Sequence, residues 1–251
     1  MKVTKRAQKI ISLLETRGEI SVHELSESLD ISPSTLRKQL AEMQADGLVI
    51  RTYGGVMPVN RVPDETFENK RHKSVFEKRR IAERARSLIP SGASVALGSG
   101  TTVYGLGMLL DDFPRAVIYT NSMQVADYLS QCAGLEVHVS SGIVRGRTGT
   151  IIGSEAAEYF RTLKPVDYAF VGCDAINSAG EILSDNPSVA QVEALVLHSA
   201  RHKYILCDSS KLGKTAVAHI ARLDGCDGLI TCRSGYNALE RYQGRTQVIY
   251  A

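Results

Sequence analysis

The residues best suited to bind a ligand follow short apolar runs in the last two thirds of the chain. The first of these runs ends in a loop of two glycines and three hydroxylated residues, namely Gly98, Ser99, Gly100, Thr101 and Thr102. Glycines let backbone N–H groups approach a ligand, hydroxyls donate hydrogen bonds, and the start of a following helix favours an anion. The loop therefore predicts a seat for a phosphate group.

Polar residues also follow three later apolar runs. Asn121 and Ser122 follow the run that ends at Tyr119, Asp174 follows another, and Lys211 comes shortly after a third. Amide, hydroxyl and carboxylate groups can hydrogen-bond sugar hydroxyls, and the lysine would add a positive charge. Ligands of open α/β sheets bind outside the carboxyl ends of the strands. We therefore expect one pocket for a phosphorylated sugar, formed by these residues and the glycine-rich loop.

The elements that must hold this pocket alternate in type along the chain. Patterns with helical spacing separate seven short apolar runs, which lie near residues 93–97, 116–119, 136–139, 168–171, 203–207, 228–231 and 247–250. Such alternation is typical of a mostly parallel sheet covered by helices. The predicted fold class of this part is α/β.

The N-terminal part contains three short helical patterns. Apolar residues at helical spacing predict a first helix over residues 4–17. Ser21 and Glu24 form an S-x-x-E capping box, which predicts the start of a second helix. Ser32 as N-cap and Pro33 at the first helical position predict a third helix that runs to about Ala45. This order of helices and turn is typical of a helix-turn-helix.

The outer face of the third predicted helix carries small polar and basic residues that suit DNA. Its N-terminal turn would enter the major groove, where small side chains allow close approach. The segment 48–56 follows and predicts a two-stranded wing that turns at its glycines, with contacts to the DNA backbone or the minor groove. The residues expected to contact double-stranded operator DNA are Ser32, Ser34, Thr35, Arg37, Lys38, Arg51 and Tyr53.

Charge is distributed unevenly along the chain. The net charge is +3, but residues 1–80 carry 15 Lys and Arg against 11 Asp and Glu, whereas residues 81–251 carry 15 against 16. An N-terminal excess of positive charge agrees with a DNA-binding module there. Ordinary variation in surface charge would explain this one observation equally well.

A change in composition indicates a domain boundary. Residues 58–75 contain prolines and mixed charges with few apolar residues, and an amphipathic helix is predicted to begin at Phe76. The predicted organisation is therefore a winged helix-turn-helix over residues 1–57, a linker over 58–75 and an α/β effector-binding domain over 76–251.

Several classes of protein are disfavoured by composition. No run of the sequence approaches 18 uncharged apolar residues, so no membrane association is expected. The five cysteines are scattered without a C-x-x-C pair, which favours reduced thiols in a cytoplasm. The six histidines form no metal-binding array. We predict no metal, no cofactor and a cytoplasmic location.

The chain resembles the DeoR family of sugar-metabolism regulators over nearly its whole length. SPSTLRKQL at 32–40 and RTYGGV at 51–56 carry the resemblance to that family's winged helix-turn-helix. GSGTT at 98–102, TNS at 120–122, GxD at 172–174 and DSSKLG at 208–213 carry the resemblance to its sensor domain, which is similar to ribose 5-phosphate isomerases. The resemblance implies a phosphorylated sugar effector and a homodimer or homotetramer on palindromic or repeated operators.

The sequence departs from the family pattern at three positions. Gln39 stands where the family usually has an aspartate in its third helix, and Tyr53 stands where a wing histidine is common. Glu193 stands where the family commonly has a lysine. The target sequence and the identity of the effector are therefore left open.

Three functions compete for these patterns. The first is a transcription regulator, a repressor of a carbohydrate catabolism operon, in which a phosphorylated sugar changes the affinity for operator DNA; it would have no catalytic residues. The second is a sugar-phosphate isomerase with Asp174 and Glu193 as acid and base, which leaves the helix-turn-helix without a use. The third, an RNA or protein interaction module, lacks the expected stacking aromatics, because the chain has no tryptophan.

Overall fold

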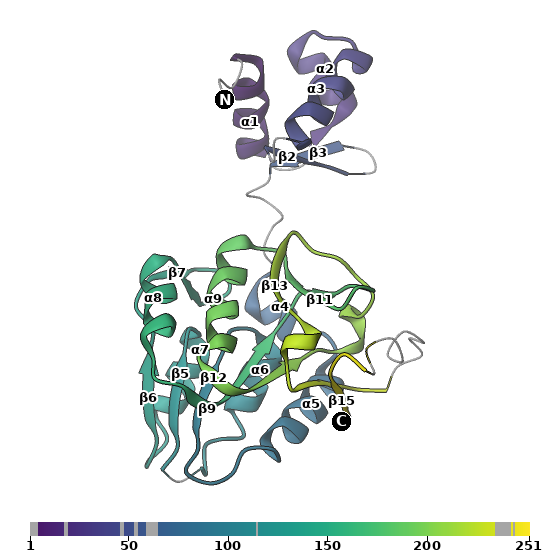
Figure 1. The fold of residues 1–251 in the computed structure, drawn as a ribbon. Helices are drawn as coiled ribbons and strands as arrows, with labels where there is room; N and C mark the ends of the chain where they lie inside the picture. The colour runs from purple at the N-terminus through teal and green to yellow at the C-terminus, as the bar shows by residue number, and fades with distance from the viewer. Residues whose placement is uncertain are drawn as a thin grey trace. The chain divides into compact units, whose positions relative to one another are not determined.

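The computed structural model describes residues 5–17, 20–45, 48–52, 55–58, 65–113, 115–233, 242 and 244–251. The chain divides into two compact units, Met1–Asp64 and Glu65–Ala251 (Figure 1). Each unit has a hydrophobic core of its own.

The first unit contains three helices and a small antiparallel sheet. The elements are α1 (Lys5–Arg17), β1 (Ile20–Ser21), α2 (Val22–Leu29), α3 (Pro33–Ala45), β2 (Val49–Arg51) and β3 (Gly55–Pro58), and the sheet order is β1-β3-β2. Its core is a cluster of fully buried side chains, among them Ile10, Leu14, Leu25, Leu36 and Leu40. The predicted order of helix, helix-turn-helix and wing is confirmed.

Local capping explains where the helices of this unit begin. Ser21 Oγ accepts a hydrogen bond from the backbone N–H of Glu24 at 3.1 Å, and the Glu24 carboxylate accepts from the N–H of Ser21 at 3.0 Å. This is the capping box predicted from the sequence. Asp30, with φ of 52°, makes the turn after α2. Ser32 Oγ then accepts from the N–H of Thr35 at 3.3 Å, which caps α3.

The second unit is built on a seven-stranded sheet in which every neighbouring pair is parallel. The strand order is β15-β14-β12-β9-β4-β5-β6. The strands are β4 (Ser94–Leu97), β5 (Val117–Thr120), β6 (Glu136–Val139), β9 (Val166–Gly172), β12 (Ala200–Leu206), β14 (Gly228–Thr231) and β15 (Gln247–Tyr250). All seven predicted strands and the predicted fold class are confirmed.

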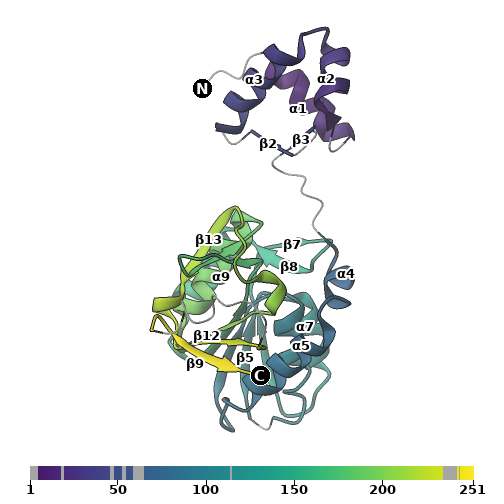
Figure 2. The same ribbon diagram turned by 90° about the vertical axis from the view of Figure 1, so that its right-hand side faces the viewer.

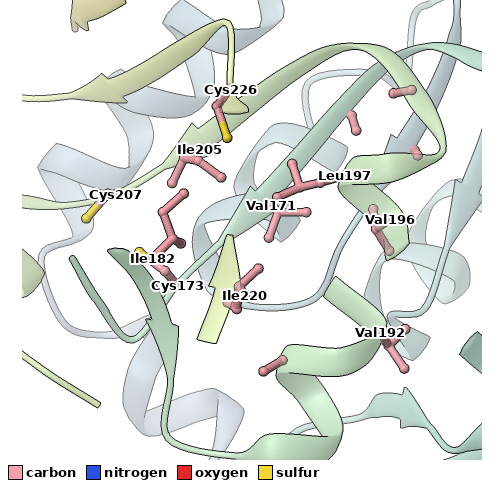
Figure 3. Close-up of a cluster of buried hydrophobic side chains, with 14 of the residues drawn as sticks. Val171, Cys173, Ile182, Val192, Val196, Leu197, Ile205, Cys207, Ile220 and Cys226 are labelled. Carbon is pink, nitrogen blue, oxygen red and sulfur yellow. The ribbon is translucent and has the colours of Figure 1, made fainter. Parts of the chain in front are cut away.

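Helices cover both faces of this sheet (Figure 2). The helices α5 (Val75–Arg86), α6 (Thr101–Gly107) and α7 (Met123–Ser130) pack against one face, where Leu97, Ile118 and Phe170 are buried. The helices α8 (Ser154–Thr162) and α9 (Pro187–His198) pack against the other face. Figure 3 shows part of that second cluster, with Val192, Val196 and Leu197 from α9 and Val171 from β9.

Shorter elements complete the second unit. They are the antiparallel hairpin of β7 (Ile143–Arg145) and β8 (Thr150–Ile152), the antiparallel sheet of β10 (Ala175–Ile176), β11 (Glu181–Ser184) and β13 (Ala218–Arg222), and the helical turns η1 (Ser209–Lys211) and η2 (Leu223–Gly225). The sequence patterns did not predict these short strands.

The structure differs from the predicted linker over residues 58–75. Residues from Glu65 onward belong to the second unit, and Phe67–Arg71 form a short helix, α4, whose first residue is buried. Thr66 Oγ1 accepts a hydrogen bond from the N–H of Asn69 at 3.2 Å, which fixes the start of this helix. The remainder of the predicted linker, 59–64, lies outside the described residues.

Within the described part of the chain, none of the helices is both long and apolar enough to cross a membrane.

Candidate functional site

The predicted DNA-contacting residues of α3 lie on its solvent-exposed face. Ser34, Thr35, Arg37 and Lys38 are exposed, whereas Leu36 is fully buried in the core of the first unit. Helical periodicity produces this division, because residues three and four apart share a face. The exposed face therefore presents two cations beside small hydroxylated side chains.

The start of α3 gathers three hydroxyl groups. Ser32 Oγ lies 3.0 Å from Ser34 Oγ and 2.8 Å from Thr35 Oγ1. The wing is tied to the same helix, since the N–H of Arg51 donates to Gln44 Oε1 at 3.0 Å while the Arg51 side chain is exposed. Tyr53, the other predicted wing contact, lies outside the described residues. Contact of these residues with DNA stays a prediction.

The glycine-rich loop joins the carboxyl end of β4 to α6. Gly100 has φ of 103°, a left-handed conformation that L side chains rarely adopt, so the loop needs a glycine there. Thr102 is buried and Thr101 is partly exposed. The hydroxyl of Ser99 is engaged within the protein, because it donates to Glu193 Oε1 at 2.6 Å. Among the described residues, no acceptor lies within hydrogen-bond distance of the Thr101 or Thr102 hydroxyl, so these two remain the hydroxyls that the loop could offer to a ligand.

Glu193 lies beneath this loop, on α9. Its Oε1 accepts hydrogen bonds from the N–H of Ser99 at 2.9 Å and from Asn121 Nδ2 at 3.3 Å, in addition to the Ser99 hydroxyl. The residue is 2% exposed, and burial raises its pKa to about 7 despite those hydrogen bonds. One carboxyl group therefore connects the glycine-rich loop after β4 with the loop after β5.

The predicted residues of the loop after β5 have different roles in the structure. Asn121 is fully buried and directs its Nδ2 to Glu193. Ser122 is the N-cap of α7, since its Oγ accepts from the N–H of Val125 at 3.4 Å. A capping hydroxyl is already used locally, so Asn121 is the better candidate for a ligand contact.

Asp174 follows β9 and is held by three donors. Its Oδ1 accepts from Lys70 Nζ at 2.9 Å, and its Oδ2 accepts from Ser184 Oγ at 2.9 Å and from the N–H of Asp185 at 3.0 Å. Burial alone would raise the pKa of Asp174, but the charges of Lys70 and Lys211 outweigh burial and lower that pKa to about 2. Asp174 is therefore a carboxylate at neutral pH, able to accept further hydrogen bonds.

Lys211 lies at the end of η1, beside the same carboxylate. Its Nζ donates to the carbonyl oxygen of Cys173 at 2.6 Å. Burial opposes the charge of Lys211, but Cys173, Asp174 and Asp208 outweigh it and raise the pKa of the amine. The structure thus brings Lys211 and Asp174 together at the ends of the neighbouring strands β12 and β9.

Sequence reasoning missed two lysines of this region. Lys70 was assigned to the predicted linker, although Thr66 followed by the helix-forming segment Phe67–Arg71 is a capping signal that could have revealed α4. Lys78 lies on α5, the amphipathic helix that the sequence predicts to begin at Phe76. Lys78 is buried, its Nζ donates to the carbonyl oxygen of Lys70, and burial lowers its pKa to about 8.

Several buried polar atoms have no hydrogen-bond partner. Among the described residues these atoms are Asn121 Oδ1, Ser140 Oγ, Thr148 Oγ1, Glu193 Oε2 and Thr231 Oγ1. Ser140 follows β6 and Thr231 ends β14, near opposite edges of the sheet, but Asn121 and Glu193 contact each other beside the glycine-rich loop. Unpaired buried polar groups cost free energy, so the Asn121–Glu193 pair marks a candidate binding position.

Two surface cavities lie elsewhere, along α8 and α9. Their volumes are about 630 and 520 Å³, and both are lined by Arg161 and Gln191. The predicted effector residues line neither of them.

Comparison with known proteins agrees with this division of the chain. A family model for the DeoR-like helix-turn-helix domain matches residues 6–62, and one for the DeoR C-terminal sensor domain matches residues 73–233. The chain is 27% identical to the glycerol-3-phosphate regulon repressor of Escherichia coli, over 92% of this chain and 91% of that protein. It is 28% identical to the L-fucose operon activator of Haemophilus influenzae, over 94% of this chain and 95% of that protein.

Among solved structures, part of the chain matches a ribose 5-phosphate isomerase at a low TM-score. The ribose 5-phosphate isomerase A of Neisseria gonorrhoeae shares 16% identity and a TM-score of 0.40, over 54% of this chain and 52% of that chain. With a winged helix-turn-helix in the first unit, a parallel α/β second unit and family models that match both, the chain belongs to the DeoR family of DNA-binding transcriptional regulators.

Proposed function

We propose that this regulator represses a carbohydrate operon and that a phosphorylated sugar, bound at the carboxyl end of the seven-stranded sheet, changes its affinity for operator DNA. The observation that carries the effector site is the order of the strands β12, β9, β4 and β5, which are neighbours in the sheet and are followed by Lys211, Asp174, the glycine-rich loop and Asn121. Asn121 Oδ1 is buried without a hydrogen-bond partner, and a polyhydroxylated ligand offers the donor that it lacks.

The charges of the site suit a ligand with both a phosphate and hydroxyl groups. Lys211 supplies a cation for the phosphate, while Asp174 keeps its negative charge at neutral pH and can accept hydroxyl hydrogens. The names of two similar proteins refer to glycerol 3-phosphate and to L-fucose, which supports this class of effector.

The first experiment is thermal unfolding of the full chain with sn-glycerol 3-phosphate, ribose 5-phosphate and fructose 6-phosphate. Inorganic phosphate and the unphosphorylated sugars are the controls. A ligand of the folded state raises the unfolding temperature by mass action. Lys211→Met should abolish the shift, whereas Lys214→Met, an exposed lysine three residues away, should retain it. If no phosphorylated compound gives a shift, the proposed effector class is wrong.

The second experiment tests the response of DNA binding. Double-stranded DNA selected by the full chain from a random library would be titrated with and without the compound that stabilises the protein. A hundredfold loss of affinity requires a difference of about 2.7 kcal/mol in effector binding between the two states. An increase in affinity would instead indicate activation, as the name of the fucose relative suggests for that protein.

An enzymatic role is less compatible with the geometry. A general base needs a pKa near the working pH, and the pKa of Asp174 is lowered to about 2. Glu193 has a pKa of about 7 but is 2% exposed, with Oε1 already engaged by Ser99. We therefore propose a binding protein without isomerase activity. Isomerisation of pentose or hexose phosphates that disappears in Asp174→Asn would contradict this.

We also propose that the chain acts in the cytoplasm as a homodimer or homotetramer. Winged helix-turn-helix proteins commonly read two half-sites, and a dimer presents two recognition helices at a fixed spacing. Sedimentation velocity of the full chain, alone and with the selected DNA, would show a monomer if this proposal is wrong.

A further inference from the structure

The short helix α4 contacts the β7–β8 hairpin and α6. The backbone N–H of Phe67 donates to the carbonyl oxygen of Arg147, in the turn of the β7–β8 hairpin, at 3.0 Å. The ring of Phe67 stands edge-on to that of Tyr104, with centroids 5.4 Å apart. Tyr104 belongs to α6, the helix that begins in the glycine-rich loop. The guanidinium of Arg71 lies over the same tyrosine ring, 5.3 Å from its centroid.

Lys70 of α4 adds a charged contact to Asp174, a residue of the proposed effector site. Its Nζ lies 2.9 Å from Asp174 Oδ1, and the two side chains are 32% and 21% exposed. Partial burial reduces solvent screening, so this ion pair is stronger than a fully exposed one. Lys78 also contacts Lys70, because its Nζ donates a hydrogen bond to the carbonyl oxygen of Lys70. The Lys70–Asp174 pair is therefore a link between α4 and the loop that follows β9.

The place of α4 in the sequence gives this link its significance. The last strand of the first unit, β3, ends at Pro58, and the second unit begins at Glu65. The first helix of the chain beyond the DNA-binding unit is therefore the helix that contacts the proposed effector site.

We propose that Lys70 couples the effector site to α4, the first helix after the DNA-binding unit, and that effector binding breaks the Lys70–Asp174 ion pair and loosens α4. This inference rests on the proposed effector site. Hydroxyl groups that hydrogen-bond Asp174 weaken its hold on Lys70, and a phosphate group attracts Lys70 away from Asp174. Both interactions act in the same direction, so the effector prefers the state with a loose α4, as population shift requires.

Amide hydrogen exchange on the full chain without DNA tests the ion pair. Lys70→Met removes the charge and keeps a side chain of similar length. We expect amides of residues 66–71 to exchange about five times faster in this variant, as the loss of about 1 kcal/mol would give. Lys70→Arg should restore slow exchange. The matched control is Lys73→Met, which breaks the more exposed Lys73–Glu65 pair (2.6 Å) and should leave the exchange of residues 66–71 unchanged.

A second arm of the same experiment tests the coupling. Sn-glycerol 3-phosphate, ribose 5-phosphate and fructose 6-phosphate are each added to wild type and to Lys70→Met. The compound that raises the unfolding temperature should speed exchange of residues 66–71 in wild type alone, and should not speed exchange within α9. A lysine with only a structural role would give no such dependence on ligand.

The outcomes separate the two proposals. Equal exchange in ligand-free wild type and Lys70→Met, or a stabilising compound that leaves residues 66–71 unchanged or slows them, would overturn the role of Lys70. Absence of any thermal shift with all three compounds would instead overturn the proposed effector class, on which the coupling depends.

Discussion

Gly98 and Glu193 are in such close contact that a side chain on the glycine would collide with the carboxylate. A Cβ atom at Gly98 would stand 2.1 Å from Glu193 Oε2 and 3.1 Å from Val171 Cγ2. The first residue of the glycine-rich loop is therefore a glycine because of packing against α9, whereas Gly100 is required by its backbone conformation.

This contact makes Gly98→Ala a sensitive test of the site. The added methyl group must displace the buried Glu193, and overpacking of a core costs about 1–3 kcal/mol. We expect a loss of that size in the free energy of unfolding, measured with urea, together with loss of the thermal shift caused by the effector. Gly105→Ala on α6 is the control, because its Cβ would lie 3.6 Å from Ala82 Cβ, an ordinary contact. Equal stability of Gly98→Ala and wild type would show that Glu193 is not fixed there.

The carboxyl group of Glu193 should make stability depend on pH between 4.5 and 7. Burial raises its pKa from 4.5 to about 7, so the folded chain binds this proton more tightly than the unfolded chain. Its contribution is favourable at low pH and is lost as the pH rises through 7, by about 3 kcal/mol. Glu193→Gln should lack this slope in urea unfolding, whereas Glu158→Gln, at an exposed carboxylate, should retain it. Parallel pH profiles of wild type and Glu193→Gln would be inconsistent with the raised pKa.

Asp174 should have the opposite dependence, at lower pH. Neighbouring lysines hold its pKa at about 2, below the ordinary 3.8, so its contribution to stability is present above pH 3.8 and is lost as the pH falls through 2. The difference in free energy of unfolding between wild type and Asp174→Asn should therefore shrink over that window. Acid titration followed by circular dichroism would measure it. A difference that grows on acidification would show that Asp174 is not stabilised by Lys70 and Lys211.

Substitutions on the exposed face of α3 should weaken DNA binding without unfolding the first unit. Arg37→Ala and Lys38→Ala remove exposed cations next to the fully buried Leu36. Loss of one phosphate contact should lower the slope of log affinity against log salt by about 1. Fluorescence anisotropy with the selected DNA at several salt concentrations gives both quantities. Arg84→Ala in the second unit is the control. Unchanged affinity for DNA in both α3 variants would show that the DNA interface lies elsewhere.

The main elements could be predicted from the sequence because their signals are local. The strand Val95–Leu97 is a short apolar run buried on both faces, and Ser21 with Glu24 is a capping box whose two hydrogen bonds involve neighbours three residues apart. The strands β7, β8 and β10 were missed because each has only two or three residues, too few to form a recognisable apolar run.

The loops of the candidate site could be predicted from the sequence, but the contacts between residues far apart in the sequence could not. The sequence pattern placed Asp174 and Lys211 after strands, and the parallel pairing of β9 with β12 brings them together. Lys70 is separated from Asp174 by 104 positions, and Glu193 from Ser99 by 94. No local pattern encodes such contacts, which arise only when the sheet and α9 assemble.

The boundary of the second unit at Glu65 has a practical consequence for hybrid proteins in which the helix-turn-helix domain of one relative replaces that of another. A hybrid joined at residue 75 would take α4 from the donor protein and set a foreign side chain against Asp174 and Tyr104. A hybrid joined between residues 59 and 64 would keep the recipient's own Phe67, Lys70 and Arg71 together with the recipient's second unit. Chimeras spliced in that short interval are the ones expected to keep the recipient's sugar response while reading the donor's operator.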